Sequence, residues 1–595
     1  MRTRVIGAVQ GRSPFSLVIR NVRIVNVYND TVTEGSIGIV DDRIAYAGPM
    51  DFACQAEEEL DGGGCYALPG FVDAHMHLES SMLTPAHFAE VVLACGTTTV
   101  AADPHEMGNV LGLEGVRALM EAAGGLPLRV LVMAPSTIPS APGFEDSGYD
   151  VGPEEAAGQA GHHLQHQLEA RLLDLPGISG LGEVMDFLAV AAGETRILSV
   201  VEEALKRGCL VDGHASLLTG RDLQAFRAAG IDSDHTLRTA DKLREELALG
   251  FNVQIQSGNL SREMAEAMNS APVQDQICLV TDDVPLPKLM ERGHLNRVVA
   301  EAVALGLDPV RAVRFATINP ARRLRLYDVG AIAPGMIADI QLVRDLREPR
   351  PEAVFCAGRP VCRGGRLLEP LSRPDLSAVL EGTVRCAPVA EGDLVIPAPA
   401  GETALVNVIR EDGVSARTTR AQRELPVTAD ADGHPALDTG GYLKMAVFNR
   451  YGKRQHGLAL IEGMGPVSGA VALTYGHDAH NLTVFGGNDA DMALAANGVI
   501  EMQGGICAAS GGRLLTRVPL PLAGLLSPER PETLLAQLRA FLSDCAHMGF
   551  HHKDLMSFFT IMPLAVSPEI KCTDRGLVDV AHKRFLPLIE ERRGS

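Results

Sequence analysis

The segment YALPGFVDAHMH (66–77) joins a short apolar run to a pair of histidines, His75 and His77. A short apolar run bounded by turn residues is typical of a buried β-strand. Alternate residues of a strand face the same side, so both imidazoles can point into one space. A His-x-His pair also arises by chance in many chains, so its meaning depends on where this strand lies in the fold.

From Tyr66 onward, short apolar runs alternate with longer amphipathic stretches, as repeated βα units require. Eight such runs predict an α/β fold with a TIM-like (β/α)8 barrel over residues 66–330. Helices are expected between them, for example over 87–96, 115–124 and 198–208, each ending near a glycine that can cap it. The candidate strands are 66–75, 97–103, 128–135, 178–185, 209–215, 230–235, 251–257 and 277–283.

The two flanks of this barrel have strand character. Residues 1–65 alternate apolar and polar side chains between turn signals, which is typical of antiparallel strands. Residues 331–369 return to the same character, so both flanks are predicted to build one small β-sandwich domain. The Pro/Gly-rich stretch 370–401 is interpreted as a linker.

Residues 402–595 are predicted to form a separate C-terminal α/β domain. Strands are expected over 442–450, 456–463, 469–476 and 482–487, and helices over 489–502 and 531–548. The Gly-rich segment QGGICAASGG (503–512) lacks the lysine of a phosphate-binding loop and is interpreted as turns.

Metal-binding side chains stand at the ends of five candidate strands. Alone, such a residue is usually a solvated or capping group. The carboxyl ends of barrel strands meet at one rim, so six together predict a site for divalent metal ions, which imidazole and carboxylate bind. The six are His75 and His77 (first strand), Glu183 (fourth), His214 (fifth), His235 (sixth) and Asp282 (eighth).

These motifs resemble the amidohydrolase superfamily, and its adenine deaminase branch in particular. The resemblance runs from about Val18 to the C-terminus, and it implies hydrolytic deamination of adenine to hypoxanthine and ammonia by a hydroxide that bridges two metal ions. A small purine base is then the substrate. The matching segments are PGFVDAHMH, ADPHEMGNV, GLGEVMDF, DGHASLLTGRDL, LVTDD, GHDAHN and KCTDRGLVDV.

The fourth strand favours a binuclear centre without a modified lysine. Hydantoinase-like relatives bridge their metals with a carboxylated lysine there, but LPGISGLGEVMDFLAVAAG contains none. Glu183 can bridge two cations, because a carboxylate has two oxygens to share. The glutamate that mononuclear deaminases carry shortly after the fifth-strand histidine is absent after His214. The resemblance therefore implies two divalent cations, Mn or Fe, with Zn or Co as alternatives.

The resemblance also suggests catalytic roles. Asp282 would be both a ligand and the general base, and Glu183 would hold the two metals together. His105, in the segment DPHE, is the candidate proton shuttle because its ordinary pKa suits both directions of transfer; a structural hydrogen bond is the alternative. Five residues are expected to contact the purine or support the site, with loop bracing or domain packing as the alternative: Glu79, Glu106, Asp283, His477 and Asp478.

Two departures from the family pattern bear on the substrate. Thr236 stands where relatives usually have glutamate, and Ala479 where they usually have serine. Fewer hydrogen-bonding groups predict slower or less selective adenine turnover. Two other functions stay open: a related hydrolase acting on another aminopurine, or a non-catalytic assembly protein built on the same barrel.

Composition narrows the partners and the location. The 595 residues include 74 acidic and 53 basic side chains, for a formal net charge of −21, which disfavours a nucleic-acid partner. Eleven cysteines without a Cys-x-x-Cys pair predict a reducing, cytoplasmic location. No membrane span or signal peptide is expected. The apolar C-terminal domain favours a homo-oligomer, most simply a dimer.

Overall fold

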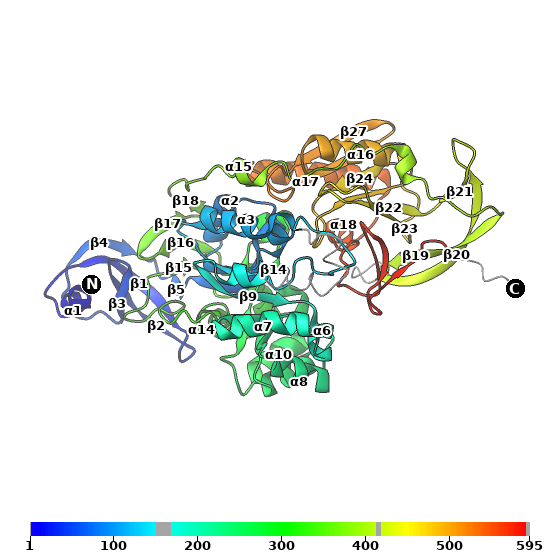
Figure 1. Cartoon of the computed structure of the whole chain (residues 1–595). Helices are drawn as coiled ribbons and strands as arrows, with labels where there is room; N and C mark the ends of the chain where they lie inside the picture. The colour runs from blue at the N-terminus through cyan, green and yellow to red at the C-terminus, as the bar shows by residue number, and fades with distance from the viewer. Residues whose placement is uncertain (1, 150–167, 412–417, 591–595) are drawn as a thin grey trace.

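The computed structural model describes residues 2–149, 168–411 and 418–590 (Figure 1). A β-sheet at one end of the molecule is followed by a layer of parallel strands and helices, and then by a second large sheet. Among the described residues, no helix is long and apolar enough to cross a membrane.

Strands from both flanks of the barrel form one nine-stranded sheet. They are β1 Phe15–Asn26, β2 Thr31–Val40, β3 Arg43–Gly48, β4 Ala56–Asp61, β5 Tyr66–Pro69, β15 Ile340–Val343, β16 Pro351–Cys356, β17 Arg359–Arg363 and β18 Arg366–Leu367, with helix α1 Arg2–Val9 beside β3. The pairing order is β18-β17-β16-β15-β5-β1-β2-β3, and β4 pairs with β1 (Figure 1). Strands from both predicted flanks therefore pair within one sheet, as β5 does with β15.

The predicted eight barrel strands are present and parallel. They are β6 Phe71–His77, β7 Thr97–Ala102, β8 Arg129–Ala134, β9 Ile178–Val184, β10 Leu210–Gly213, β11 Ser233–Asp234, β12 Asn252–Ile255 and β13 Ile277–Leu279. β14 Asp282–Asp283 follows β13 and pairs with β6. Between β10 and β11 a side chain makes the link, because the Gly213 N–H donates to Ser233 Oγ at 3.0 Å. The barrel fold is confirmed.

Helices cover the outside of these strands. In α7 the buried residues Ile197, Val200, Val201 and Ala204 recur every three to four positions, so one face packs inward. The helices are α2 Pro85–Ala94, α3 His105–Ala123, α6 Phe187–Ala192, α7 Thr195–Lys206, α8 Gly220–Ala228, α9 Ala240–Ala248, α10 Arg262–Ser270, α11 Leu286–Arg292, α12 Leu295–Ala304, α13 Pro309–Phe315 and α14 Ile318–Arg323.

The first predicted strand, 66–75, is two strands in the structure. β5 pairs with β15 in the flanking sheet, and β6 begins the barrel at Phe71. A Cβ built on the intervening Gly70 would lie 2.2 Å from Thr98 Oγ1. Glycine therefore lets the chain pass close to β7 while it changes sheets. The sequence pattern does not reveal this break, because both strands are apolar.

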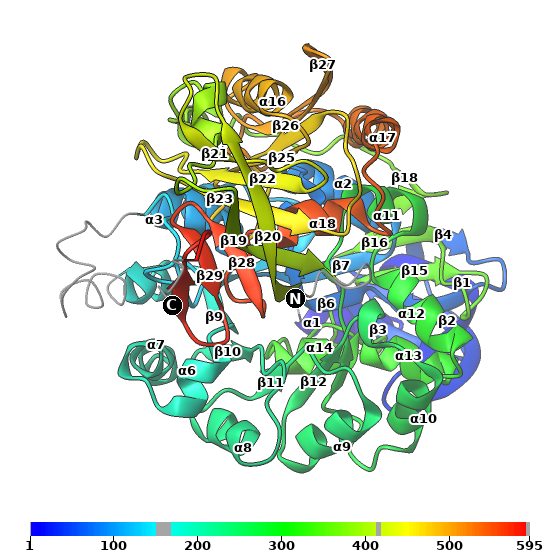
Figure 2. The same cartoon turned by 90° about the vertical axis from the view of Figure 1, so that its right-hand side faces the viewer.

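The C-terminal part has a second nine-stranded sheet and a small three-stranded one. Figure 2 shows the C-terminal part on one side of the barrel and α8, α9 and α10 on the other. The elements are β19 Thr403–Glu411, β20 Thr418–Ala429, β21 Pro435–Leu437, β22 Leu443–Phe448, β23 His456–Glu462, β24 Ala470–Leu473, β25 Leu482–Gly486, α16 Asp489–Glu501, β26 Gly505–Ser510, β27 Arg513–Pro519, α17 Pro531–Met548, α18 Leu555–Ile561, β28 Ile570–Thr573, β29 Gly576–Asp579 and β30 Arg584–Leu586. The segment 370–401 holds only helix α15 Ser377–Leu380 and a short 3-10 turn, Glu391–Leu394.

The interpretation of 503–512 as turns is wrong. Its centre is β26, which pairs with β24 on one side and β27 on the other. The glycines belong to the two ends, where Gly504, Gly505, Gly511 and Gly512 have positive φ. The residues between them, Ile506 to Ala509, are buried. Glycine-rich ends therefore concealed a short buried strand.

We expect Gly70→Ala to destabilise the protein by about 1–3 kcal/mol, because the added Cβ would overlap the β-branched Thr98. Differential scanning calorimetry measures the loss as a lower Tm. Gly392→Ala is the matched control, since no atom lies within 4 Å of its Cβ position. Equal Tm values for the two variants would contradict the close passage at Gly70.

Candidate active site

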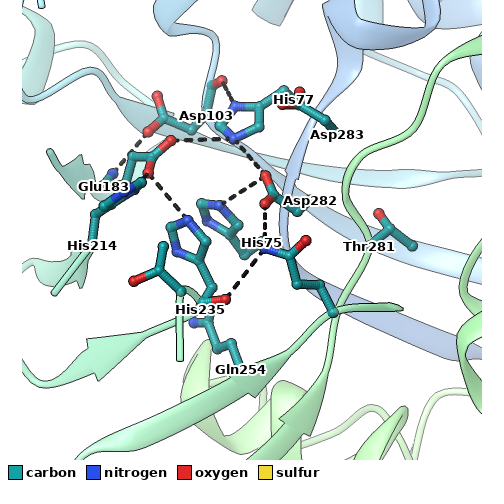
Figure 3. A network of polar contacts seen from close by, with 12 residues as sticks. His75, His77, Asp103, Glu183, His214, His235, Gln254, Thr281, Asp282 and Asp283 are labelled. Atoms are coloured by element: carbon teal, nitrogen blue, oxygen red, sulfur yellow. Dashed lines mark hydrogen bonds and ion pairs between the residues drawn. The ribbon is translucent and has the colours of Figure 1, made fainter. Parts of the chain in front are cut away.

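The six predicted ligands lie together at the carboxyl ends of the barrel strands (Figure 3). They come from five strands: His75 and His77 from β6, Glu183 from β9, His214 after β10, His235 after β11 and Asp282 from β14. Parallel strands bring these distant residues to one rim, because each strand ends at the same edge of the barrel.

Glu183 is the centre of the cluster. Its Oε1 lies 3.3 Å from His77 Nε2. Its Oε2 lies 2.6 Å from His214 Nδ1 and 3.3 Å from His235 Nε2. The two oxygens thus face different histidines, which is the arrangement that a carboxylate shared by two cations requires.

Asp282 closes the cluster from the opposite side. Its Oδ1 lies 3.7 Å from His75 Nε2 and 3.4 Å from His77 Nε2. Its Oδ2 accepts a hydrogen bond from Gln256 Nε2 at 2.6 Å. The backbone of Asp282 is left-handed, with φ 57°, a conformation that is strained for most residues and recurs at functional sites.

Neighbouring groups orient the two β6 histidines. His75 Nδ1 lies 2.8 Å from Asp212 Oδ2, and His77 Nδ1 lies 3.0 Å from the Asp103 carbonyl oxygen. Donation of Nδ1–H to these acceptors leaves the Nε2 lone pairs facing the cluster. His75 Nε2 is buried and has no hydrogen-bond partner in the described part of the chain. A histidine held in this way is typical of a metal ligand.

The buried carboxylates of the cluster attract positive charge. Burial opposes a charged His75, yet its contacts with Asp212 and Asp282 raise its pKa well above the usual range. Burial likewise opposes a charged Glu183, but His235 and His214 hold its pKa well below the usual range. Divalent cations would supply the positive charge that the two carboxylates attract, and imidazole and carboxylate donors fit such cations.

The C-terminal domain reaches this rim. Asp478 Oδ1, from the segment between β24 and β25, lies 3.6 Å from Nε2 of His105, the first residue of α3. His105 Nδ1 lies 3.9 Å from Glu183 Oε1. His477 Nδ1 lies 3.8 Å from Glu106 Oε1. The structure therefore brings the predicted shuttle and the predicted C-terminal residues together.

Two further carboxyl groups are fully buried beside the cluster. Burial raises the pKa of Glu79 to about 7 and that of Glu106 well above the usual range. Glu79 Oε1 accepts the Met107 N–H at 3.2 Å, whereas neither oxygen of Glu106 has a hydrogen-bond partner among the described residues. Asp283 is exposed and accepts a hydrogen bond from Ser80 Oγ.

Sequence reasoning missed the residues that support the ligands. Asp212 stands two positions before His214, and alternate strand residues face the same side, so the pattern DGH could have indicated it. Gln256 and the Asp103 carbonyl carried no such signal, because their contacts with Asp282 and His77 depend on how strands pack around the rim.

Thr236 and Ala479, the two departures from the family pattern, both form hydrogen bonds with nearby segments. The Thr236 hydroxyl donates to Asp234 Oδ1 at 2.6 Å and accepts the Ser216 N–H at 2.7 Å, so it ties together the segments that carry His235 and His214. The Ala479 carbonyl accepts the Tyr451 hydroxyl at 2.5 Å. Their effect on substrate choice stays a prediction.

A cavity of about 200 Å³ lies between the barrel loops and the C-terminal domain. None of the six predicted ligands lines it, but its wall residue Phe187 stacks against the ring of His214 at 6.3 Å between centroids. Its lining also includes Ala565, Val566 and Val578 from the C-terminal domain. The wall of this cavity therefore adjoins the ring of one predicted ligand, His214.

Known proteins are similar to this chain over nearly its whole length. Residues 66–361 match the Amidohydrolase family, and residues 415–584 match the Adenine deaminase C-terminal domain. The adenine deaminase of Nitratidesulfovibrio vulgaris strain Hildenborough is 40% identical over 577 residues, 96% of each chain. That of Kosmotoga olearia is 35% identical over 594 residues, 99% of each chain. A solved D-hydantoinase structure aligns with 60% of this chain and 97% of its own, with a TM-score of 0.45 and 16% identity.

Asp212→Asn is expected to weaken metal binding by about 10- to 100-fold, the usual effect of losing a group that orients a ligand histidine. Equilibrium dialysis against Mn²⁺ with elemental analysis measures the change. Asp241→Asn is the control, because Asp241 pairs only with solvent-exposed Arg244 in the contacts described and is itself 95% exposed. Wild-type Mn²⁺ affinity in Asp212→Asn would contradict the role given to the His75–Asp212 contact.

Proposed function

This chain belongs to the adenine deaminase family of amidohydrolases, and from that premise we propose that its barrel rim hydrolyses adenine to hypoxanthine and ammonia. One observation carries the proposal: the two oxygens of Glu183 face separate histidines at the rim of a barrel whose relatives are adenine deaminases along nearly their whole length.

The amidohydrolase family implies divalent metal binding. We propose two cations, Mn or Fe with Zn or Co as alternatives, which share Glu183. His75, His77 and Asp282 would hold one on the Oε1 side of Glu183, and His214 and His235 the other on the Oε2 side. When bound, such cations lower the pKa of water and so supply the nucleophile at neutral pH.

Asp282 fits the role of general base. Its Oδ1 faces the cluster, while Gln256 holds Oδ2. Burial opposes its charge, but His75 and His77 keep its pKa well below the usual range. Asp282 therefore stays ionised, and its Oδ1 can take a proton from the attacking water.

His105 fits the role of proton shuttle. Its Nδ1 faces Glu183 and its Nε2 faces Asp478. Burial opposes a charged ring, but Glu106 and Asp478 raise the pKa of His105 well above the usual range. A proton kept on this ring can pass to the amine that leaves C6.

The buried carboxyl groups suit recognition of a purine edge. Glu106 is fully buried and neither of its oxygens has a hydrogen-bond partner among the described residues, so its carboxyl group can accept from a ring N–H and, when protonated, donate to a ring nitrogen. Asp283 and His477 are further candidates for purine contacts. A hydrolase acting on another aminopurine would use the same groups. The non-catalytic alternative is disfavoured, because assembly proteins of this kind commonly lose ligands and all six are present. Cytoplasmic location and a dimer stay predictions.

Wild-type protein stripped of metal should regain ammonia release from adenine as Mn²⁺ is added, up to two equivalents per chain, because Glu183 offers one oxygen to each cation. The assay pairs ammonia detection with elemental analysis. Activity complete at one equivalent would exclude the shared site. Turnover of 2,6-diaminopurine without adenine turnover would favour another aminopurine as substrate.

Asp282→Asn is expected to lower kcat for adenine by about 10² to 10⁴, the usual span for a positioned acid–base group, with little change in Tm. Asp283→Asn is the comparison, because it makes the same change from carboxylate to amide at the next residue, whose side chain is exposed. Steady-state kinetics of both variants decides the role. Near-normal turnover in Asp282→Asn together with a loss in Asp283→Asn would move the role to Asp283.

A further inference from the structure

The loop after β8 joins the barrel to the C-terminal domain, and most of its contacts are made by Asp146, which is 5% exposed. Its N–H donates to Asp574 Oδ1 at 3.1 Å. Its carbonyl oxygen accepts from Asn481 Nδ2 at 2.9 Å. Its Oδ1 accepts from Arg575 Nε at 3.1 Å, and its Oδ2 accepts from Gln455 Nε2. Every polar group of Asp146 is therefore held by a residue of the C-terminal domain.

Residues around Asp146 strengthen this attachment. Arg575 Nη1 donates to the Gly143 carbonyl at 3.2 Å, and the Thr573 hydroxyl donates to the Phe144 carbonyl at 2.5 Å. Asp574 is fully buried, and its Oδ2 accepts from Asn449 Nδ2 at 2.8 Å. The turn between β28 and β29 thus forms hydrogen bonds with both side-chain and backbone groups of the loop after β8.

The loop contacts the segment that carries Asp478 through Asn481. Asn481, which bonds the Asp146 carbonyl, lies three residues after Asp478 on the same buried segment. Asn481 Oδ1 also accepts the Arg450 N–H at 3.1 Å. The Asp146 carbonyl is therefore bonded to a side chain that lies three residues from the Asp478 carboxylate.

The same loop also contacts α3, the helix that begins at His105. Gly148, two residues after Asp146, donates its N–H to the Asn109 carbonyl at 2.7 Å, and Asn109 Nδ2 donates to the His105 carbonyl at 2.9 Å. A Cβ on Gly148 would lie 1.8 Å from the Val110 carbonyl oxygen, so the loop is pressed against the first turns of α3. The same loop is therefore attached to both members of the His105–Asp478 pair.

We propose that Asp146 is a positioning residue, held by Arg575, which sets the 3.6 Å separation between Asp478 of the C-terminal domain and His105 of the barrel. The proposal rests on the proposed function in one respect, because it takes His105 to move protons. Through this loop the C-terminal domain becomes part of the catalytic apparatus. Proton transfer depends steeply on the distance between the groups that share the proton.

The test compares Arg575→Met and Asp146→Asn with a matched interdomain control. Arg539, on α17, pairs with Glu291 of α11 at 2.7 Å and also joins the C-terminal domain to the barrel, but both side chains are exposed. We expect Arg575→Met and Asp146→Asn to lower kcat for adenine by about 10- to 100-fold, as small displacements of reacting groups do, with unchanged metal content.

Arg539→Met, the control variant, should keep kcat within about twofold of wild type. Arg575→Lys should recover part of the loss. Equal losses in Arg575→Met and Arg539→Met would overturn the proposal, because general domain contact would then explain both.

A double-mutant cycle separates positioning from general stability. If Asp146 acts through Asp478, Asp146→Asn should cost less than about twofold in an Asp478→Asn background. The full loss in both backgrounds would overturn the proposal. If Asp146→Asn does not fold, the same cycle uses Arg575→Met, whose side chain is 31% exposed.

A crystal structure of Arg575→Met distinguishes this proposal from the proposed function. We expect a longer separation between His105 Nε2 and Asp478 Oδ1, and an unchanged 3.6 Å would overturn the positioning. If wild type fails to deaminate adenine while this separation lengthens in the variant, the proposed function fails and the positioning stands.

Discussion

The charge on Glu183 organises the rim of the barrel. A fully ionised carboxylate in a buried place is unfavourable unless cations or donors surround it, and here three histidines from three strands converge on its two oxygens. Asp212 and the Asp103 carbonyl hold the first-strand histidines in the orientation that this convergence needs. The barrel supplies the convergence, because only parallel strands deliver side chains from such distant positions to one edge.

Much of this arrangement was accessible from the sequence. Short apolar runs that alternate with amphipathic helical stretches identified the barrel, and His75, Glu183 and Asp282 stood at strand ends where a shared rim brings them together. Three features were not accessible. The sheet change at Gly70 depends on a close passage by Thr98, and β26 is masked by glycines at its ends. The contacts of Asp146 span more than 300 residues of sequence, and no local pattern carries them.

The C-terminal domain has two kinds of contact with the barrel. On the exposed side, ion pairs such as Arg539–Glu291 are solvated and contribute little free energy. At the loop after β8, the buried Asp146 is paired across the boundary with Asp574, Asn481 and Arg575, where an unpaired group would cost several times more. One of these buried contacts, from Asn481, lies on the segment that carries Asp478, which approaches His105 at 3.6 Å.

The sheet built from both flanks has a consequence for synthesis on the ribosome. Leu68 of β5 pairs with Gln341 of β15, so the strand that leads into the barrel waits for a partner translated much later. At roughly 5–20 residues per second, the delay is on the order of 15–55 s. During that time β5 presents an unpaired, apolar edge of the kind that recruits other chains. The nascent protein should therefore depend on chaperone protection until residue 343 has emerged.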